Sequence, residues 1–389
     1  MPKPKKSYTF RKLINDLHLW LGLASGIILF IVCLTGCILT FETELVQWFD
    51  AEDHYAAPTH APLDFNTIIT DLEQQDTLVK DFIFYGEAHR NLQFTLITKA
   101  ELQASGGKPV RGKSVTINPY TGATVQATGR TKAFMHTVEA LHRYLLLDKT
   151  WGRPIVGVST IIFVFLCLSG LLLWFPKTLK KLKKRKAWTQ GFTIKTKAHW
   201  KRLNYDIHNT FGFYALVPLL LMGLTGLLWS FTWYYDGLEV VLGDQLGKSR
   251  FETTIPLAQN NANAGMATVN LYTLLQKTDS ILPYSNYATR VTLPLNPNES
   301  VMIRKISGDA LAFNAADKLQ FNPYTNSLIS ATYFKDESFG SKVAGLIRGI
   351  HVGNFAGGLT QWIYFICCLV ATSLPITGTL IWFNKKKKA

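Results

Sequence analysis

The chain contains the stretch HLWLGLASGIILFIVCLTGCILTF at residues 18–41, and its pattern returns as HNTFGFYALVPLLLMGLTGLLWSF at residues 208–231. In each copy a glycine follows the first His by four residues, and a Leu-Thr-Gly tripeptide follows a long apolar run. The His and the Thr of that tripeptide are 17 positions apart in both copies. This shared register indicates an internal duplication.

Four stretches of the chain contain no Asp, Glu, Lys or Arg: residues 19–41, 155–175, 211–233 and 358–383. A chain of 389 residues that is 48% hydrophobic and carries a formal charge of +15 fits either a basic soluble protein or a membrane protein. Each uncharged stretch is long enough to cross a hydrocarbon core of ~30 Å as a helix. We therefore predict four transmembrane helices.

Lysine and arginine are concentrated in three segments, which predicts the orientation. Residues 1–17, 176–207 and the tail from Lys385 hold twenty basic residues against two acidic ones, Asp16 and Asp206. Basic residues are enriched on the cytoplasmic side of membranes, where they also meet anionic lipid. We expect both termini and the middle connection to be cytoplasmic and the long loops to be external. Topology accounts for the basic charge, so no nucleic-acid partner is expected.

The predicted fold class is a membrane protein with a four-transmembrane-helix bundle made of two parallel repeats and with two external α+β domains. Such repeats are related by an axis along the membrane normal. The segments are a cytoplasmic arm (1–17), helix 1 (18–41), an external domain (42–141), helix 2 (142–176), a basic cytoplasmic connection (177–207), helix 3 (208–233), a second external domain (234–345), helix 4 (346–384) and a basic tail (385–389).

Each long loop is predicted to hold a small module of helix and strands. The first has a helix at 65–75 and strands at 82–85, 92–97 and 115–117, and the second has a helix at 269–277 and strands at 288–293 and 300–306. Each loop also contains an Asn-Pro-Tyr-Thr turn. Gly122 and Asn326 occupy the turn position that requires positive φ, which Gly accepts freely and Asn tolerates better than most residues.

Four histidines recur at equivalent positions of the two halves: His18 and His208 at the cytoplasmic ends of helices 1 and 3, and His142 and His351 at the external ends of helices 2 and 4. A two-fold axis would set the members of each pair opposite one another. Two opposed neutral imidazoles can supply both axial ligands of a haem iron, which favours electron transfer over oxygen chemistry. The chain has no C-x-x-C-H motif, so two haems of the non-covalent b type are predicted.

Further residues are candidates for cofactor contacts. Gly22 and Gly212 are predicted to let a flat macrocycle approach the backbone. Arginines at the external side are predicted to pair with haem propionates, with lipid contact or a salt bridge as the alternative; they are Arg143, Arg153 and Arg348. Reserve ligands without a repeat partner are His136 and His199, and loop histidines expected to be solvated are His54, His60 and His89. The alternative role of the paired histidines is packing or proton relay.

The chain resembles the PepSY-associated transmembrane family of bacterial inner-membrane proteins. The resemblance is carried by the H-x-x-x-G…L-T-G helices, the L-H-R-x-L segment at 141–145, the G-I-H-V-G segment at 349–353 and the N-P-x-T-G turn, and it covers nearly the entire chain. It implies PepSY-like external domains, a bacterial inner-membrane location with periplasmic loops, and membrane-bound haem that delivers electrons to a ferric siderophore. Asn326 departs from the turn pattern of the family.

The first hypothesis is therefore a dihaem transmembrane ferric-siderophore reductase. The chain has no G-x-G-x-x-G turn followed by a helix, so its electron donor, in the cytoplasm or the membrane, is a separate molecule. A second hypothesis is a non-redox transporter or uptake accessory whose external modules bind a siderophore or peptide. A third is a structural or inhibitory membrane protein that binds a protein partner. Bound haem distinguishes the first from the other two.

Overall fold

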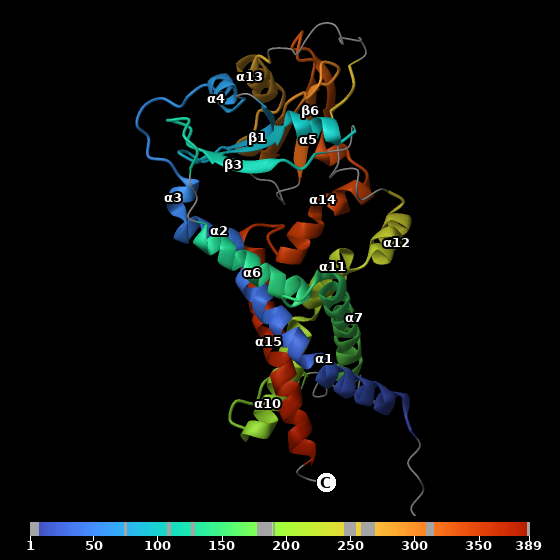
Figure 1. Ribbon diagram of the computed structural model, residues 1–389. Helices are drawn as coiled ribbons and strands as arrows, with labels where there is room; N and C mark the ends of the chain where they lie inside the picture. The colour runs from blue at the N-terminus through green and yellow to red at the C-terminus, as the bar shows by residue number, and fades with distance from the viewer. Residues whose placement is uncertain are drawn as a thin grey trace, which may run out of the picture. The chain divides into compact units, whose positions relative to one another are not determined.

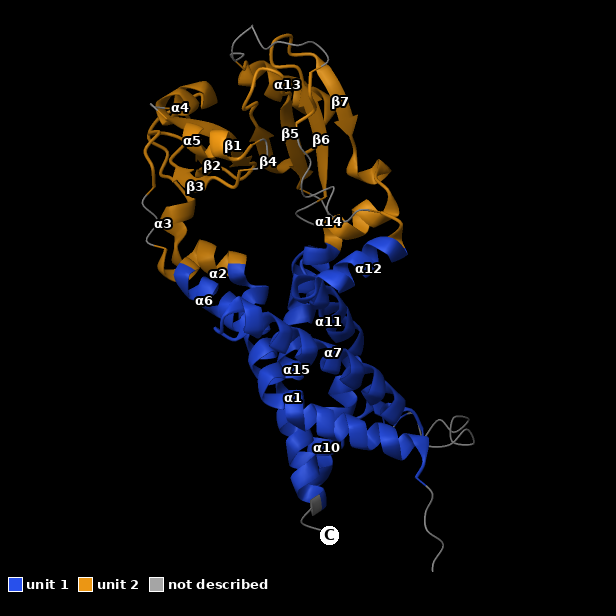
Figure 2. Ribbon diagram, turned by 45° about the vertical axis from the view of Figure 1, so that its right-hand side comes forward, with its two compact units in different colours: residues 1–42, 133–241, 347–389 blue, residues 43–132, 242–346 orange. Residues whose placement is uncertain are grey.

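The computed structural model describes residues 8–73, 76–106, 110–125, 129–176, 189, 191–244, 254–257, 269–308 and 315–386. Parts of the predicted arm, connection and tail, namely residues 1–7, 177–188, 190 and 387–389, lie outside this set. The chain forms two compact units, coloured separately in Figure 2. The helical unit is Met1–Glu42, Ala133–Val241 and Ile347–Ala389, and the sheet unit is Thr43–Lys132 and Leu242–Leu346.

Three helices of the helical unit are long and apolar enough to cross a membrane: α1 (Phe10–Thr40), α7 (Lys149–Trp174) and α15 (Gly358–Lys386) (Figure 1). The third predicted span is a bent pair, α10 (Trp200–Tyr214) and α11 (Leu216–Ser230), whose axes differ by 63°. The protein is thus a membrane protein whose described residues contain three candidate spans, or four if the bent pair is one span. A single straight helix over 208–233 was expected.

The bend has a cause in the sequence. Pro218 lacks a backbone N–H, and in a continuous helix its ring would clash with the carbonyl four residues earlier. That carbonyl belongs to Tyr214, the residue at which α10 ends. The break at Ala215 therefore avoids the clash.

Separate helices precede α7 and α15, namely α6 (Arg130–Tyr144) and α14 (Phe339–Val352). The chain turns after α6 at Leu145 and Leu146, which have φ of 57° and 58°, and after α14 at Gly353, which has φ of 91°. The predicted segments 142–176 and 346–384 each contain this turn, so neither is one continuous helix. As a result, the histidines at their starts lie on α6 and α14.

The long helices contact one another in two matched sets. α1 packs against α7, as α10 packs against α15, and α1 packs against α15, as α11 packs against α7. In the sequence repeat, α1 of the first half corresponds to α10 and α11 of the second, and α7 corresponds to α15. Small residues such as Ser25 and Gly26 of α1 are buried at these contacts, where they allow close helix approach.

The sheet unit is built around one seven-stranded antiparallel sheet with the order β3-β2-β1-β4-β5-β6-β7. The strands are β1 (Thr77–Tyr85), β2 (Leu92–Thr98), β3 (Lys113–Ile117), β4 (Asn286–Thr292), β5 (Val301–Ser307), β6 (Ala316–Phe321) and β7 (Leu328–Thr332). The first loop supplies three strands and the second supplies four. Pairing of β1 with β4 joins them, because it satisfies two strand edges that separate modules would expose.

The two loops therefore share one compact unit and one core, whereas one domain per loop was expected. Their buried aromatic and aliphatic side chains form a single cluster that includes Phe82, Phe94, Ile303 and Phe321. Helices α4 (Phe65–Leu72) and α13 (Leu271–Ile281) contribute Ile68 and Leu274 to this cluster. Further short helices are α2 (Glu42–Phe49), α3 (Ala51–His54), α5 (Lys99–Ala104), α12 (Thr232–Leu242) and the 3-10 turn η1 (Phe334–Asp336).

The two Asn-Pro-Tyr-Thr turns have the predicted geometry. Gly122 has φ of 70° and Asn326 has φ of 53°. In each turn the side chain of the first Asn, Asn118 or Asn322, accepts hydrogen bonds from the next two available backbone N–H groups. Asn326 thus adopts the conformation that glycine has in the first copy.

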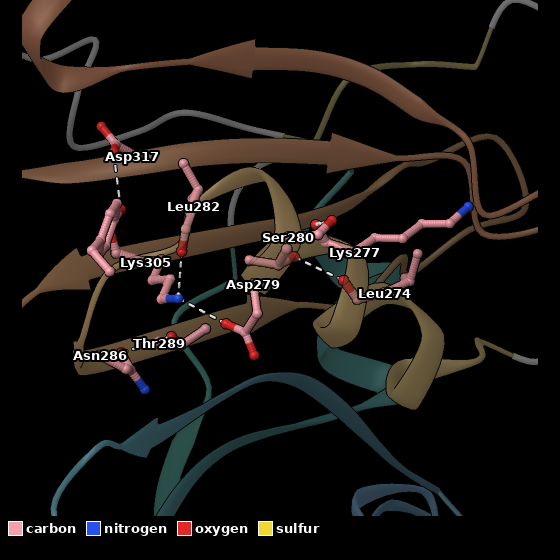
Figure 3. Close-up of polar contacts among 11 residues, drawn as sticks. Leu274, Lys277, Asp279, Ser280, Leu282, Asn286, Thr289, Lys305 and Asp317 are labelled. Carbon is pink, nitrogen blue, oxygen red and sulfur yellow. Dashed lines mark hydrogen bonds and ion pairs between the residues drawn. The ribbon is translucent and has the colours of Figure 1, made fainter.

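The ammonium of Lys305 is one of two buried lysine charges in the sheet unit, the other being that of Lys318 (Figure 3 shows Lys305). The Lys305 ammonium on β5 is 2.7 Å from Asp279 Oδ1 and 2.8 Å from Leu282 O, at the C-terminal end of α13. The Lys305 side chain is 4% exposed and that of Asp279 is 72% exposed. Beside it, the Tyr284 hydroxyl donates to Asp317, and burial together with this hydrogen bond raises the pKa of Tyr284. These contacts attach α13 to the sheet.

Candidate functional site

The structure brings together both pairs of histidines that the sequence repeat suggested. The ring centroids of His18 on α1 and His208 on α10 are 6.5 Å apart with the planes at 85°. Those of His142 on α6 and His351 on α14 are 6.3 Å apart with the planes at 72°. We call them the 18/208 pair and the 142/351 pair. Each pair takes one ring from each half of the duplicated chain, and both lie within the helical unit.

Every one of these rings is held at Nδ1 by a Ser or Thr hydroxyl. The distances from Nδ1 to the hydroxyl oxygen are 2.8 Å for His18 and Ser169, 2.8 Å for His208 and Thr377, 3.1 Å for His142 and Thr35, and 2.9 Å for His351 and Thr225. In each case the hydroxyl residue is followed by a glycine. We call Thr35-Gly36, Ser169-Gly170, Thr225-Gly226 and Thr377-Gly378 the hydroxyl–glycine dipeptides.

The hydrogen bonds determine which ring nitrogen carries the proton in His142 and His351, and they favour the same Nδ1–H form in His18 and His208. Each hydroxyl donates its hydrogen to a carbonyl of the preceding helical turn, as Thr35 does to Ile31 at 2.8 Å and Ser169 to Leu166 at 3.3 Å. The oxygen is then left to accept from Nδ1–H. For His142 and His351, Nδ1 also lies 2.9 Å and 3.1 Å from backbone carbonyls, which only accept. Since a neutral imidazole has one N–H, the lone pair is on Nε2.

The glycine of each dipeptide lies against the Cε1 edge of the ring. A Cβ atom at the glycine would be 3.5 Å from Cε1 for Gly36 and His142, 3.4 Å for Gly170 and His18, 3.2 Å for Gly226 and His351, and 3.3 Å for Gly378 and His208. These are contacts at or inside normal van der Waals distance. At Gly226 and Gly378 the missing side chain therefore lets the ring approach the helix that carries its hydroxyl partner, whereas at Gly36 and Gly170 an added methyl group would make an ordinary contact.

The glycines that were expected to face the cofactor contact a helix instead. A Cβ atom at Gly22 or Gly212 would be 3.7 Å from a leucine methyl, that of Leu166 on α7 or Leu374 on α15. These two positions allow α1 to pack on α7 and α10 on α15. Their expected role in macrocycle approach remains a prediction.

The three arginines that were predicted to lie at the external side differ in their surroundings. Arg143 Nη1 is 2.8 Å from Glu139 Oε1, so its charge already has a partner on the same helix. Arg348 is exposed. Arg153 Nε, by contrast, is buried and makes no hydrogen bond with the described residues, and the same holds for the hydroxyl of Tyr364, which packs on Gly353. Two buried polar atoms without protein partners are consistent with a polar group that belongs to a cofactor.

The other histidines are not brought into a pair with a second His. His136 is 71% exposed and lies 3.8 Å from Glu139, and His199 is exposed at the start of α10. His60 and His89 are exposed, as expected, whereas His54 is half-buried. Within the described ranges, no group of three or more His, Cys, Asp or Glu is placed to hold a metal ion. The two histidine pairs are therefore the candidate site.

The pairs fit the axial positions of a haem iron. An imidazole nitrogen lies about 2.0–2.1 Å from a first-row metal and its ring centroid about 1.2 Å farther, so two opposed axial rings have centroids about 6.5 Å apart. The observed separations are 6.5 Å and 6.3 Å. The Nδ1–H tautomer leaves the Nε2 lone pair for a metal, and no Nε2 atom of these rings has a hydrogen bond within the described part of the chain. The donor set and spacing therefore suit two bis-imidazole sites.

The Ser and Thr partners of the rings were not identified from the sequence. The repeated Leu-Thr-Gly tripeptides were visible, and so was the similar spacing from His142 to Ser169 and from His351 to Thr377. These repeated spacings pointed to the hydroxyl partners, because a hydroxyl residue that recurs together with a His in both halves indicates a contact that both halves make. What was lacking was the helix arrangement that assigns each hydroxyl to its ring.

Comparison with known proteins gives one result for the whole chain. A family model described as the PepSY-associated TM region matches residues 16–385. The match includes all four histidines and all four hydroxyl–glycine dipeptides. A search of curated proteins found no match.

Proposed function

Since the chain belongs to the PepSY-associated transmembrane family, we propose that it is a dihaem b electron-transfer protein that reduces a periplasmic ferric siderophore. The observation that supports this most strongly is the geometry of the four rings. Two histidine pairs have the spacing of axial ligands, and backbone carbonyl acceptors at Nδ1 leave the Nε2 lone pairs of His142 and His351 available. Structural histidines would not need this repeated arrangement.

In this proposal His18 and His208 hold one haem, and His142 and His351 hold the other. Bound haem would supply one-electron exchange, and the two imidazoles of each pair would hold it in a form that favours electron transfer over oxygen chemistry. The role of the protein is to hold the rings, exclude water and fix the separation of the two sites. Arg153 and Tyr364 are the candidates for contacts with the polar edge of the group near the 142/351 pair, because their buried polar atoms have no protein partner in the described set.

The direction of electron flow follows from the proposed topology. In this topology, which the distribution of basic residues supports, the 18/208 pair lies on the cytoplasmic side of a bacterial inner membrane and the 142/351 pair on the periplasmic side. One electron from a donor in the cytoplasm or the membrane converts one chelated Fe(III) to Fe(II) on the opposite side. The loops 42–141 and 234–345 are then periplasmic and available to the chelate.

The test is an absorption spectrum of the detergent-purified full chain, oxidised and dithionite-reduced, after expression with adequate haem. We expect a Soret band, a pyridine haemochrome of the b type and two haems per chain. His18→Ala or His208→Ala should remove one haem, and His142→Ala or His351→Ala should remove the other. His136→Ala is the matched control, because this exposed His pairs only with Glu139.

A colourless protein would refute the proposal and favour a non-redox uptake accessory. Loss of both haems, or of neither, in the single His variants would refute the assignment of the pairs. If haem is bound as proposed, mixing the reduced protein with a ferric hydroxamate or catecholate chelate should oxidise the protein and release Fe(II), which ferrozine detects. If no chelate reoxidised the protein, the assignment of a ferric siderophore as substrate would be wrong, while haem-based electron transfer would remain the proposal.

A further inference from the structure

The four hydroxyl–glycine dipeptides connect the helices of each half in a reciprocal way. In the first half, α1 carries His18 and supplies Thr35 to His142, while α7 supplies Ser169 to His18. In the second half, α11 supplies Thr225 to His351, while α15 supplies Thr377 to His208. Each half thus holds both of its own rings before they meet the rings of the other half.

A Ser or Thr in an apolar helix needs no external partner, because its hydroxyl bonds to a carbonyl of its own helix. All four of these hydroxyls make that bond and a second contact with a ring nitrogen. The second contact is the feature that helix formation does not explain. Its recurrence at two places in each half of the duplicated chain, each with a glycine at the Cε1 edge of the ring, indicates a function of the ring and not of the helix.

We infer that Thr35, Ser169, Thr225 and Thr377 are positioning residues, which fix the Nδ1–H tautomer of the four histidines and direct each Nε2 toward the opposite ring. This inference rests on the proposed function for the role of the rings as haem ligands. The tautomer and the orientation of each ring, however, are properties that the protein has without cofactor. A metal-ligating His generally donates its other N–H to an acceptor, which fixes the ring and raises its basicity. Here side-chain hydroxyls take that role inside the membrane-spanning helices.

His18 depends more on its hydroxyl than the other three rings do, since His208 also has a backbone hydrogen bond, to Leu374. His142 and His351 have a second acceptor, the backbone carbonyl of Val32 at 2.9 Å or Met222 at 3.1 Å. For His18, the hydrogen bond to Ser169 is the one that the described residues provide. Removal of the hydroxyl should therefore release His18 and leave His142 largely held.

The decisive comparison is Ser169→Ala with Thr35→Val, two substitutions in the same half that each delete only a hydroxyl function. In haem-free protein with ¹⁵N-labelled histidine, long-range ¹⁵N–¹H spectra distinguish the two tautomers. We expect the Nδ1–H form for all four rings of the wild type. Ser169→Ala should shift His18 to a mixture of tautomers, Thr35→Val should leave His142 in the Nδ1–H form, and Ser169→Thr should restore His18.

The loaded protein gives a second readout, the reduction potential of each haem. Loss of the acceptor makes the ring a weaker donor, so the ferric state is stabilised less and the potential rises. For Ser169→Ala we expect a change of roughly tenfold in the oxidised-to-reduced ratio at fixed ambient potential, about 59 mV for one electron. The haem on the 142/351 pair should change by less than about threefold in Thr35→Val, since a carbonyl acceptor remains.

An Nε2–H tautomer of His18 in the wild type, or an unchanged His18 in Ser169→Ala, would overturn the inference. So would failure of Ser169→Thr to restore the wild-type spectrum, because a packing role would not require the hydroxyl. The proposed function fails separately: a colourless wild type whose rings still have the Nδ1–H tautomer would refute haem binding and retain the positioning role.

Discussion

Alanine substitutions of the four glycines at the Cε1 edges of the rings should have opposite effects on haem retention and stability at different positions. An added Cβ would be 3.2 Å from Cε1 of His351 at Gly226 and 3.3 Å from that of His208 at Gly378. At Gly170 and Gly36 the corresponding distances are 3.4 Å and 3.5 Å. The first two are shorter than the optimal carbon separation of about 3.5–4.0 Å, and the last two are close to it.

The magnitudes follow from two competing terms. Gly→Ala in a helix interior is favourable by roughly 0.5–1 kcal/mol when the methyl group has space. Insertion of a methyl group into a filled site costs about 1–3 kcal/mol, since the neighbour must move. For Gly36→Ala and Gly170→Ala the first term should win, with unchanged ligand retention. For Gly226→Ala the ring must shift by a few tenths of an ångström, and a net loss of about 1 kcal/mol corresponds to a roughly fivefold weaker site.

The assay is haem content per chain and the melting temperature of all four variants, purified in parallel. Gly226→Ala should lose haem from the 142/351 pair and Gly378→Ala from the 18/208 pair, whereas Gly36→Ala and Gly170→Ala should bind two haems and melt at or above the wild-type temperature. Equal haem loss in all four variants would show that the distance from the added Cβ to Cε1 of the ring does not control the fit. Full retention in Gly226→Ala would refute the ring contact itself.

Two predictions concern the sheet unit. Asp279→Asn removes the carboxylate partner of the Lys305 side chain, which is 4% exposed. Because Asp279 itself is solvated, we expect the free energy of unfolding of the full chain, measured with denaturant, to fall by about 2 kcal/mol, below the range for a fully buried pair. Asp336→Asn changes an exposed aspartate of the same unit and should cost nothing, so equal effects of the two variants would contradict the argument. Burial and the hydrogen bond to Asp317 raise the pKa of Tyr284. The folded protein therefore retains this proton as the pH rises above the ordinary pKa of about 10, and the free energy of unfolding of the unit falls there. Tyr284→Phe should reduce this fall, and the same dependence of unfolding free energy on pH in variant and wild type would refute the prediction.

Much of the fold was accessible from the sequence because apolar length and turn chemistry are local properties. The spans α1, α7 and α15, the helices α4 and α13 and the Asn-Pro-Tyr-Thr turns were all expected near their observed positions. The break at Ala215 was missed although Pro218 pointed to it, since hydropathy outweighed the proline. The joining of both loops into one sheet was not predictable, because pairing of β1 with β4 depends on contacts between residues about 200 positions apart.

The candidate site shows the same division. Repetition of His18 as His208 and of His142 as His351 was enough to suggest two pairs, since symmetry converts equal spacing into opposed positions. The hydroxyl partners were not assigned because a Thr in an apolar helix has a sufficient local explanation. Only the interhelical distances distinguish Thr35, which holds a ring, from a Thr that bonds to its own helix alone.

The arrangement of contacts explains why the duplicated chain needs both halves. Within a half, each His donates its Nδ1–H to a hydroxyl on a helix of the same half, so tautomer and orientation are set locally. Across the halves, each His meets its counterpart, so a two-ring site exists only when both halves are present. The sheet unit follows the same rule, because strands of one half complete an edge left open by the other. Local contacts prepare each ring, and the pairing of repeats creates the site. A change at a hydroxyl should therefore alter the properties of one site, whereas a change that separates the halves should abolish both.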